Sequence, residues 1–449
     1  MDAVTDAIAR YAVDLSHDDL SASAVHGMKG RLVDSIGCAL GGLNGEPVRI
    51  ARQIASVTHG EPPARVFFTG EMTTVDMAAF ANGLMVRYLD FNDTYQAREG
   101  GHPSDVIAGT LAVADAHHLS GRDALLAVIA GFETICALAE SERLSVKAID
   151  HSMHVAVGTA VGACKAMGLD YDRTVHAISM AVVSNVSLKV ARDGHLSMWK
   201  SGSAANASRG GVFSARLASM GMTSPDEPFA SPGGIAGLAG EETTVPTFGG
   251  RGQPFHTDRS SIKFFPAQYT VQAPIWAALQ LREDLNGAIP DEIIVYTYKS
   301  AVTSSADPTK WQVSDRETAD HSMPYVVAVA LLDGEVTPAQ FSPERVAEPA
   351  VAALMQRINV REDTVMTKEF PGTQAARIEA QVGDKRYSVV IPNCKGHEKN
   401  PATDAEIDWK FRMLAKDATS VGRAESMLAR LWAFDSEPDV SEWVASLVL

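Results

Sequence analysis

Residues 77–118 read MAAFANGLMVRYL, DFNDTYQAREGGHPSD and VIAGTLAVADAHH in succession, so a polar segment lies between two apolar ones. Both apolar segments repeat hydrophobic residues at the three- and four-residue spacing of an amphipathic helix. Between them, Gly100, Gly101 and Pro103 disfavour a helix interior, and the chain should break there. Polar loops between core helices are common places for functional residues. We therefore predict two packed helices joined by a functional loop at 90–105.

The same helical spacing extends over the first half of the chain. Apolar residues repeat every three or four positions between 21 and 43, from Val25 to Leu40. From about 222 to 260 this periodicity is lost and Gly and Pro are frequent, which predicts a long irregular connection. Further helices are predicted near 75–89, 105–118, 123–140, 153–168, 172–188 and 203–221.

The pattern changes after residue 263. EIIVYTYKS at 292–300 is rich in β-branched and aromatic residues and predicts a strand. AARIEAQV and KRYSVVIP flank a Gly383-Asp384 turn, which predicts a β-hairpin. Thr403 and Glu406 fit a capping box at the start of a late helix. Other helices are predicted at about 267–284, 320–332, 343–357 and 422–434.

These elements predict a mainly α fold in which a large all-helical domain is joined to a smaller α+β lid domain. The helical domain is expected over 1–262 and the α+β domain over 263–398. The helical tail, 399–449, is expected to pack back onto the first domain.

Composition argues against several kinds of partner. The formal net charge is −16 and no run of Lys or Arg occurs, so neither nucleic acid nor anionic lipid is an expected partner. Asp2 and Asp6 stand where a signal peptide would carry positive charge. We find no later stretch that approaches the roughly 18 apolar residues of a membrane span. The sequence therefore predicts a cytoplasmic protein.

Other enzyme classes have weaker support. GGIAGLAG at 233–240 lacks the G-x-G-x-x-G of a dinucleotide site, and no G-x-S-x-G hydrolase elbow occurs. His151 and His154 lack the H-E-x-x-H spacing of a zinc site. Two interpretations of Asp90 and Asp93 stay open. They could form a magnesium site, or they could belong to a loop that ends the helix and satisfies its own backbone. The cysteines are too far apart for an iron–sulfur cluster and are interpreted mainly as buried side chains: Cys38, Cys136, Cys164 and Cys394.

Two histidines and two lysines have unusual surroundings. His102 follows two glycines, so a loop presents its ring. His151 lies at a predicted helix start, where the helix dipole lowers the pKa of an imidazole and favours a neutral ring that can accept a proton. Lys200 opens a helix rich in small residues. Lys263 lies among apolar residues, where an ammonium needs an anionic partner unless it reaches the surface.

Several ordered motifs resemble the MmgE/PrpD family over nearly the whole chain: DSIGCALGG from Asp34, ANGLMVRYLDFNDTY from Ala81, GGHPSD from Gly100, MWKSGSAANASRGG from Met198, SIKFFPAQY from Ser261, ETADHSMPYVVAVALLDG from Glu317 and CKGHEKNP from Cys394. The resemblance implies a homodimer with a site between the domains that uses neither a metal nor a cofactor. The residues it implies for that site are Asp90, Thr94, His102, His151, Lys200, Lys263 and Tyr325, with His154 as an alternative to His151.

The resemblance also implies a hydro-lyase that acts on a small polycarboxylate, with 2-methylcitrate dehydratase of propionate metabolism as the first expectation. Proton abstraction next to a carboxylate needs a base and a cationic field. Lys200 and Lys263 would bind carboxylates and Thr94 would contact the substrate. One histidine would abstract the proton, and the other histidine or Tyr325 would protonate the leaving hydroxyl.

Three alternatives within the resemblance stay open: decarboxylation of cis-aconitate, epimerisation of iminodisuccinate, and a catalytically silent ligand-binding member. In the dehydratases of the family, an acidic and an aromatic residue come shortly before the loop histidine, as in Glu-Trp-Gly-His. This chain has Glu99-Gly100-Gly101-His102 in that place.

Overall fold

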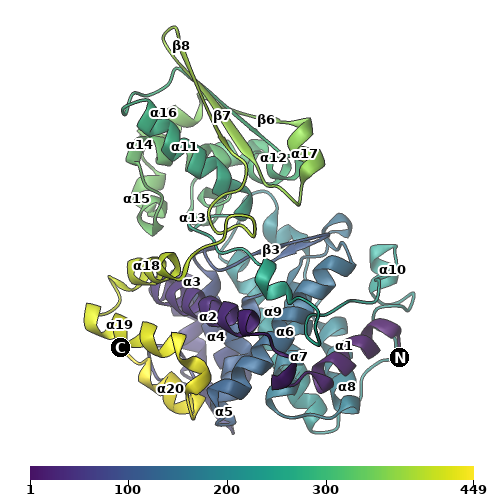
Figure 1. Cartoon of the computed structure of the whole chain (residues 1–449). Coiled ribbons are helices and arrows are strands. Elements are labelled where there is room, and N and C mark those ends of the chain that lie inside the picture. Colours follow the sequence, from purple (N-terminus) through teal and green to yellow (C-terminus); the bar gives the residue numbers. More distant parts are fainter.

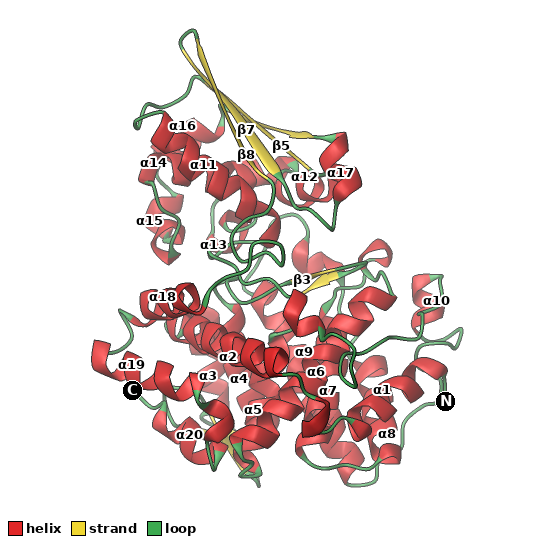
Figure 2. Cartoon of the chain, viewed as in Figure 1, coloured by secondary structure: helices red, strands yellow, loops and turns green.

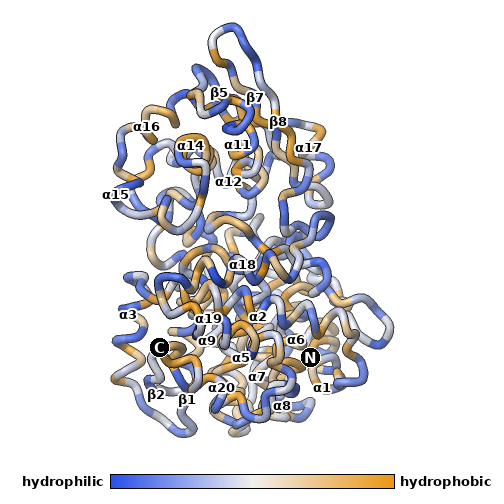
Figure 3. The backbone as a smooth tube through the Cα atoms, turned by 60° about the vertical axis from the view of Figure 1, so that its left-hand side comes forward, coloured by the Kyte–Doolittle hydropathy of each residue, from blue (hydrophilic) through white to orange (hydrophobic). Residues whose placement is uncertain are grey.

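The computed structural model describes the backbone of all 449 residues and every side chain except that of Val146. The chain forms a large helical body and a smaller body with a β-sheet, joined by a narrower junction (Figures 1 and 3). Two large hydrophobic clusters correspond to these bodies: the first includes residues between Val4 and Leu447, and the second only residues between Phe264 and Val389. The predicted mainly α fold class is confirmed.

The helical body is built around α7, which packs against α5, α6 and α9, while α4 packs on α5 and α9. Two short antiparallel pairs, β1 (Pro63–Arg65) with β2 (Met72–Thr74) and β3 (Tyr95–Gln96) with β4 (Gly100–Gly101), interrupt the helices. The helices are α1 (Ala3–Asp14), α2 (Ala22–Gly42), α3 (Glu46–Ala55), α4 (Val75–Arg87), α5 (Asp105–Ala116), α6 (Gly121–Ser141), α7 (Ser152–Ala166), α8 (Tyr171–Ser184), α9 (Trp199–Ser219) and α10 (Ile235–Ala239).

Small residues let the central helices approach closely. A Cβ atom on Gly158 of α7 would lie 2.6 Å from the backbone oxygen of Gly131 in α6. A Cβ on Gly211 of α9 would lie 2.4 Å from the backbone oxygen of Ala156 in α7. Both distances are too short for any side chain, so glycine is required where these helices cross.

Helix α6 corrects one expectation from the sequence. It is long and apolar enough to cross a membrane, although we expected no such stretch. However, 94% of its apolar window is buried inside the fold. Its hydrophobicity is therefore used in the core, where α6 is covered by α5 and α7.

The second body carries a four-stranded sheet in the order β6-β5-β7-β8. β5 (Glu292–Thr297) runs parallel to β6 (Ile358–Glu362) and antiparallel to β7 (Ala376–Val382), which forms the predicted hairpin with β8 (Lys385–Ile391). Helices α11 and α14 pack on the sheet (Figure 2). The helices are α11 (Gln272–Asp284), α12 (Lys299–Ser305), α13 (Arg316–Ala319), α14 (Met323–Asp333), α15 (Pro343–Val346), α16 (Pro349–Met355) and α17 (Thr364–Glu369).

Two details of this body differ from the sequence prediction. The expected helix at 343–357 is divided into α15 and α16, because Pro349 begins a new helix and cannot continue the preceding one. The strand β6 was not predicted. Its residues are mostly exposed and include charges, so they lack the apolar alternation by which a strand is recognised.

The tail returns to the helical body, where α18 (Asp404–Ala415) and α19 (Val421–Trp432) pack on α2, and α20 (Val440–Ser446) packs on α5 (Figure 1). The capping box is confirmed: Thr403 accepts from the backbone of Glu406, whose carboxylate accepts from Thr403. The helix α20 was not predicted from the sequence. Its Trp443 is buried against Phe434. Short 3-10 helices complete the chain: η1 (His17–Asp19), η2 (Ser145–Lys147), η3 (Lys189–Arg192), η4 (His256–Arg259), η5 (Tyr269–Val271), η6 (Pro308–Trp311), η7 (Pro338–Phe341) and η8 (Phe434–Ser436).

Candidate active site

The loop at 90–105 lies at the junction of the two bodies. Asp90 follows the end of α4 in a left-handed conformation, with φ +49°, which aspartate tolerates better than most residues. Thr94 exchanges backbone hydrogen bonds with Ser261, two residues before Lys263. The Thr94 hydroxyl donates to the backbone oxygen of Gly101 at 3.0 Å. The contacts of Thr94 therefore hold the loop together and fix it against the segment that carries Lys263.

Asp90 is the centre of a buried charged cluster. Its Oδ1 accepts from Nη1 of Arg87 at 2.5 Å and from Nζ of Lys263 at 2.6 Å. Its Oδ2 lies 3.8 Å from Nζ of Lys200. Burial raises the pKa of Asp90, but the cations Arg87, Lys263 and Lys200 together lower it well below its ordinary value. Asp90 is therefore ionised and holds these cations in place.

Lys200 links the two bodies. Its Nζ donates to Oδ1 and Oδ2 of Asp320 at 2.7 and 2.6 Å, across 120 residues of sequence. His321 follows Asp320 and donates from Nδ1 to its carboxylate at 2.5 Å, while its Nε2 lies 3.5 Å from Asp90. Burial lowers the pKa of His321 to about 4. The lysines are not surface side chains, since Lys200 and Lys263 are 1% and 0% exposed.

The hydrogen bonds of His102 fix its tautomer. Nδ1 lies 2.6 Å from the backbone oxygen of Asp93, which can only accept, so Nδ1 carries the proton. Nε2 lies 2.9 Å from Nη2 of Arg87, which can only donate, so Nε2 is unprotonated. Burial, with the nearby charges of Arg87 and Lys263, keeps the pKa of His102 well below its ordinary value. His102 is therefore a neutral imidazole with both nitrogens engaged.

His151 differs from His102 in that no hydrogen bond to the described residues fixes its ring, since Nδ1 lies 3.8 Å from Oδ2 of Asp150. It occupies the N-cap position of α7 without a capping hydrogen bond from its side chain, and its ring meets that of His102 edge to face with centroids 5.6 Å apart. Its Nε2 is buried and has no hydrogen-bond partner among the side chains that the structure describes. Burial lowers the pKa of His151 to about 3. This low pKa agrees with the neutral ring expected from the sequence, but its largest cause is burial and not the helix dipole.

The structure does not bring two other predicted residues into this cluster. His154, the alternative to His151, pairs with Glu142 at 2.7 Å between Nε2 and Oε1. Tyr325 lies in the core of the second body, where its hydroxyl donates to the backbone oxygen of Gln340 at 2.5 Å and its ring packs near Phe341. The phenol proton of Tyr325 is therefore engaged within its own body.

Comparison with known proteins identifies the family. Residues 6–245 match the MmgE/PrpD N-terminal domain, and residues 265–433 match the MmgE/PrpD C-terminal domain. The chain belongs to the MmgE/PrpD family. It is 28% identical to the 2-methylcitrate dehydratase of Cupriavidus necator, covering 82% of this chain and 78% of the relative.

Two further relatives carry the same name. The 2-methylcitrate dehydratase of Escherichia coli K12 is 26% identical over 82% of this chain and 81% of its own. The mitochondrial 2-methylcitrate dehydratase of Yarrowia lipolytica is 28% identical over 85% of this chain and 75% of its own. The prediction of an enzyme of the hydro-lyase class is confirmed by these relatives.

Three side chains of the charged cluster around Asp90 could ligate a cation: Asp90, Asp320 and His321. Their ligand atoms lie within 4.8 Å of one another. Lys200 occupies both oxygens of Asp320, and Lys263 and Arg87 occupy Oδ1 of Asp90. A metal ion would have to displace an ammonium and remain beside other cations. The donor set is therefore a poor fit for a divalent ion.

The proposed magnesium pair Asp90 and Asp93 fits no better. Oδ1 of Asp93 accepts from the backbone nitrogen of Ser104 at 3.1 Å. This contact is what we expect if the Asp93 side chain satisfies the backbone of the loop and binds no metal. Burial raises the pKa of Asp93 to about 7. A carboxyl group that is partly protonated near neutral pH is a weak ligand for magnesium.

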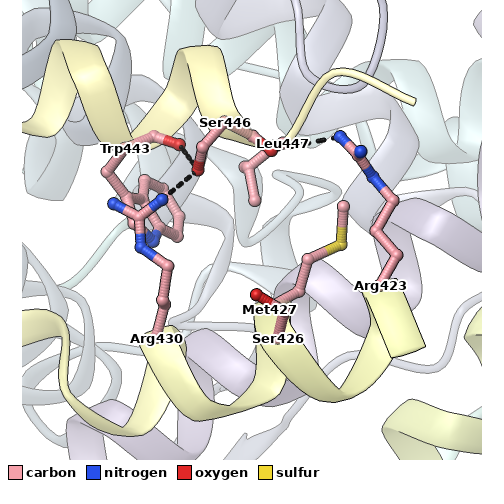
Figure 4. A pocket seen from close by; sticks show the side chains of 7 residues that line it. All are labelled: Arg423, Ser426, Met427, Arg430, Trp443, Ser446 and Leu447. Carbon is pink, nitrogen blue, oxygen red and sulfur yellow. Dashed lines mark hydrogen bonds between the residues drawn. The ribbon is translucent and has the colours of Figure 1, made fainter. Parts of the chain in front are cut away.

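Two surface cavities of this MmgE/PrpD protein lie away from the cluster. One, of about 850 Å³, is lined by the end of α1 and the facing ends of α6, α7 and α8. The other, of about 100 Å³, lies between α19 and α20 and is flanked by Arg423 and Arg430 (Figure 4). Both arginines donate to residues of the C-terminal segment, and Arg430 also pairs with Glu437. These contacts fasten the tail.

Sequence reasoning missed several members of the cluster. Arg87 lies three residues before Asp90, within the segment that was interpreted as an amphipathic helix. It was therefore not considered as a site residue. Asp320 and His321 lie inside the quoted ETADHSMPY motif, where an Asp-His pair directly before a helix cap was an available signal. Lys410 of α18 is 0% exposed and donates to the backbone oxygens of Phe91 and Lys263 at 2.7 and 2.9 Å. The sequence offered no indication of this contact.

Proposed function

We propose that this MmgE/PrpD protein is a metal-independent hydro-lyase that removes water from a small hydroxy-polycarboxylate, with 2-methylcitrate as the first candidate substrate. The observation that carries the proposal is a neutral histidine with a free nitrogen, His151, beside a buried cluster of three cations. The names of the relatives support the same reaction class. If 2-methylcitrate is the substrate, the enzyme serves propionate metabolism, and we propose a cytoplasmic location.

The reaction determines which groups are needed. A base takes the proton from a carbon next to a carboxylate, and the electrons of that C–H bond form the new double bond. The C–O bond to the hydroxyl breaks, and the leaving oxygen takes a proton to become water. Negative charge develops on the neighbouring carboxylate, so a fixed cationic field lowers the barrier.

His151 is the proposed base. A base must be unprotonated at the working pH, and the pKa of about 3 keeps this imidazole neutral. Its Nε2 is available, whereas both nitrogens of His102 are engaged by Arg87 and the backbone of Asp93. His102 is then a positioning residue that supports the His151 ring and holds Arg87.

Lys263 is the proposed proton donor to the leaving hydroxyl, in place of Tyr325. Burial lowers the pKa of Lys263 to about 8, which makes its ammonium a suitable acid near neutral pH. Lys200 and Lys263 would each contact a substrate carboxylate, and at Lys200 this carboxylate would replace that of Asp320. Thr94 would act by holding the loop.

Substrate entry requires the two bodies to separate. Asp320 and His321 come from the second body, whereas Asp90, His151 and Lys200 come from the helical body. The lysines are fully buried, while the side chains of His102 and His151 are 11% and 14% exposed. We propose that the ion pair between Lys200 and Asp320 opens when substrate enters past the histidines.

We also propose that the enzyme is a homodimer formed through an apolar surface on α9 and the segments beside it. Trp199 and Phe213 are both 52% exposed and, being fourteen residues apart, lie on one face of α9. Nearby in the chain, Leu188 and Val190 are 63% and 72% exposed. Exposed apolar residues that gather on one surface are typical of a protein interface.

The function is tested by turnover of 2-methylcitrate and citrate, followed by the absorbance of the unsaturated product. Parallel assays measure CO₂ released from cis-aconitate and inversion of iminodisuccinate, with each assay repeated after exhaustive chelation. We expect dehydration, undiminished by chelation. Product from cis-aconitate or iminodisuccinate alone would replace the proposed reaction, and loss of activity on chelation would overturn metal independence.

The proposed base is tested on whichever substrate reacts. We expect His151→Ala to lower kcat by about 10²- to 10⁴-fold, the usual contribution of a general base. His118→Ala is the matched control, because that side chain is 68% exposed and pairs with Asp439 far along the chain. Full activity of His151→Ala would show that the base is another residue.

A further inference from the structure

Arg192, the last residue of η3, joins the segments that carry the proposed base and one of the lysines. Its Nε donates to Oδ2 of Asp150 at 2.8 Å, and its Nη1 donates to the backbone oxygen of Lys200 at 2.9 Å. The same Asp150 oxygen lies 3.8 Å from Nδ1 of His151. Arg192 is therefore a close neighbour of His151, on the side of the cluster nearest the start of α9.

One nitrogen of the Arg192 guanidinium, Nη2, has no hydrogen-bond partner among the described residues. This nitrogen is also buried. The Arg192 side chain as a whole is 12% exposed, similar to the histidines at the same edge of the cluster. A buried N–H group without an acceptor is costly, so its position calls for an acceptor from outside the protein.

The remaining contacts hold this group ready for a ligand. Asp150 is fixed by the backbone nitrogen of Ser152 at 2.9 Å as well as by Arg192. Although burial raises the pKa of Asp150, Arg192 and His151 lower it below its ordinary value, so the carboxylate is charged and the guanidinium stays in place. A planar guanidinium with a fixed orientation matches a carboxylate better than an ammonium does.

We propose that Nη2 of Arg192 binds a substrate carboxylate and makes the site selective for tricarboxylates over dicarboxylates. This inference rests on the proposed function, which supplies the polycarboxylate substrate. Lys200 and Lys263 provide two interior cations, and Arg192 provides a further cation at the exposed edge, on the Nδ1 side of His151. A dicarboxylate uses the two lysines and leaves Arg192 without a partner.

The inference is tested with two ligands that cannot lose water: tricarballylate, which has three carboxylates, and glutarate, which has the same carbon chain without the middle one. Their dissociation constants are measured by calorimetry for the full-length wild type, Arg192→Gln and Arg192→Lys. Arg122→Gln, an exposed arginine on α6, is the matched control. Thermal melting verifies that each variant is folded.

We expect the wild type to bind tricarballylate more tightly than glutarate. Arg192→Gln should weaken tricarballylate about 10- to 100-fold, the range expected for a charge-assisted hydrogen bond, and leave glutarate nearly unchanged. Arg192→Lys should fall between the two, and Arg122→Gln should match the wild type. The ratio of the two constants is the readout, because a merely structural role of Arg192 would weaken both ligands equally.

Two other outcomes are distinguishable. Equal weakening of both ligands, or a wild type that binds them equally, would overturn the role of Arg192 and leave the proposed function standing. A wild type that binds neither ligand and does not turn over any polycarboxylate would overturn the proposed function itself.

Discussion

Lys263 donates from Nζ to two atoms of Asp90, the carboxylate Oδ1 at 2.6 Å and the backbone oxygen at 2.8 Å, although the residues are 173 positions apart. One ammonium thus fixes both the side chain and the backbone of the residue that begins the site loop. Both partners are buried, so without Asp90 the ammonium would lose its carboxylate, and without Lys263 the carboxylate would keep only Arg87 as a hydrogen-bond donor among the described residues.

Replacing Lys263 with Met should destabilise the fold and abolish most activity. Removing one partner of a buried ion pair costs about 3–5 kcal/mol in the free energy of unfolding, measured in denaturant, and the remaining contact of Asp90 with Arg87 places the expected loss at the lower end of this range. Adding Asp90→Asn should lower stability further and recover none of the activity, because the buried Arg87 then loses its carboxylate contact at 2.5 Å. Lys299→Met, on the exposed start of α12, is the control. Stability of Lys263→Met within 1 kcal/mol of wild type would contradict this pairing.

The same lysine should set the alkaline limit of activity. Since the pKa of Lys263 is about 8, its ammonium loses the proton as pH rises through 8, and kcat/KM should fall there. Lys263→Arg should lose most of its kcat at every pH, because a guanidinium keeps the positive charge but does not give up its proton. The measurement is the pH profile of kcat/KM. A wild-type profile that stays flat to pH 10, or an undiminished kcat in Lys263→Arg, would exclude the role as acid.

Lys410 should act as a positioning residue from the tail. Its Nζ also pairs with Asp34 at 2.5 Å and lies 3.8 Å from the centre of the Phe91 ring. We expect Lys410→Met to lower the free energy of unfolding by about 3–5 kcal/mol and to lower kcat, because the backbone of Lys263 loses a support. Lys416→Met, exposed at the end of α18, should change neither quantity. Undiminished kcat in folded Lys410→Met would show that the tail does not position the site.

Asp93 should make the protein less stable as pH rises from about 4 to about 7. Burial raises the pKa of Asp93 to about 7, so in this window the folded state binds a proton that the unfolded state has released. Its contribution to stability is complete below pH 4 and is lost as pH rises through 7. The free energy of unfolding of Asp93→Asn, minus that of wild type, should therefore increase over this range. A difference independent of pH would show that Asp93 does not titrate in this way.

The proposed dimer surface should be sensitive to charge. Trp199→Glu places a carboxylate on the apolar face of α9 and should convert the dimer to a monomer in light scattering after size-exclusion chromatography. Trp409→Glu is a matched control, since that tryptophan is 53% exposed on α18, away from this face. A wild type that is monomeric, or a Trp199→Glu dimer as stable as wild type, would contradict the surface.

Local patterns predicted most helices of the first body within a few residues, because the spacing of apolar side chains reports which face of a helix is buried. The hairpin of β7 and β8 and the capping box at Thr403 were also predicted, since turn and cap chemistry depends on adjacent residues. The strand β6 and the division between α15 and α16 were missed: β6 shows too little alternation, and Pro349 interrupts an otherwise helical pattern.

The site shows the same limit. The sequence by itself determined the helical scaffold, the break at Gly100 and Gly101, and the residue types that form the loop. Only the tertiary structure decided that Lys200 faces Asp320, that His321 joins the cluster and that Tyr325 lies elsewhere. The physical reason is that backbone periodicity follows from neighbours in the chain, whereas buried charges are paired by long-range packing that carries no local signal.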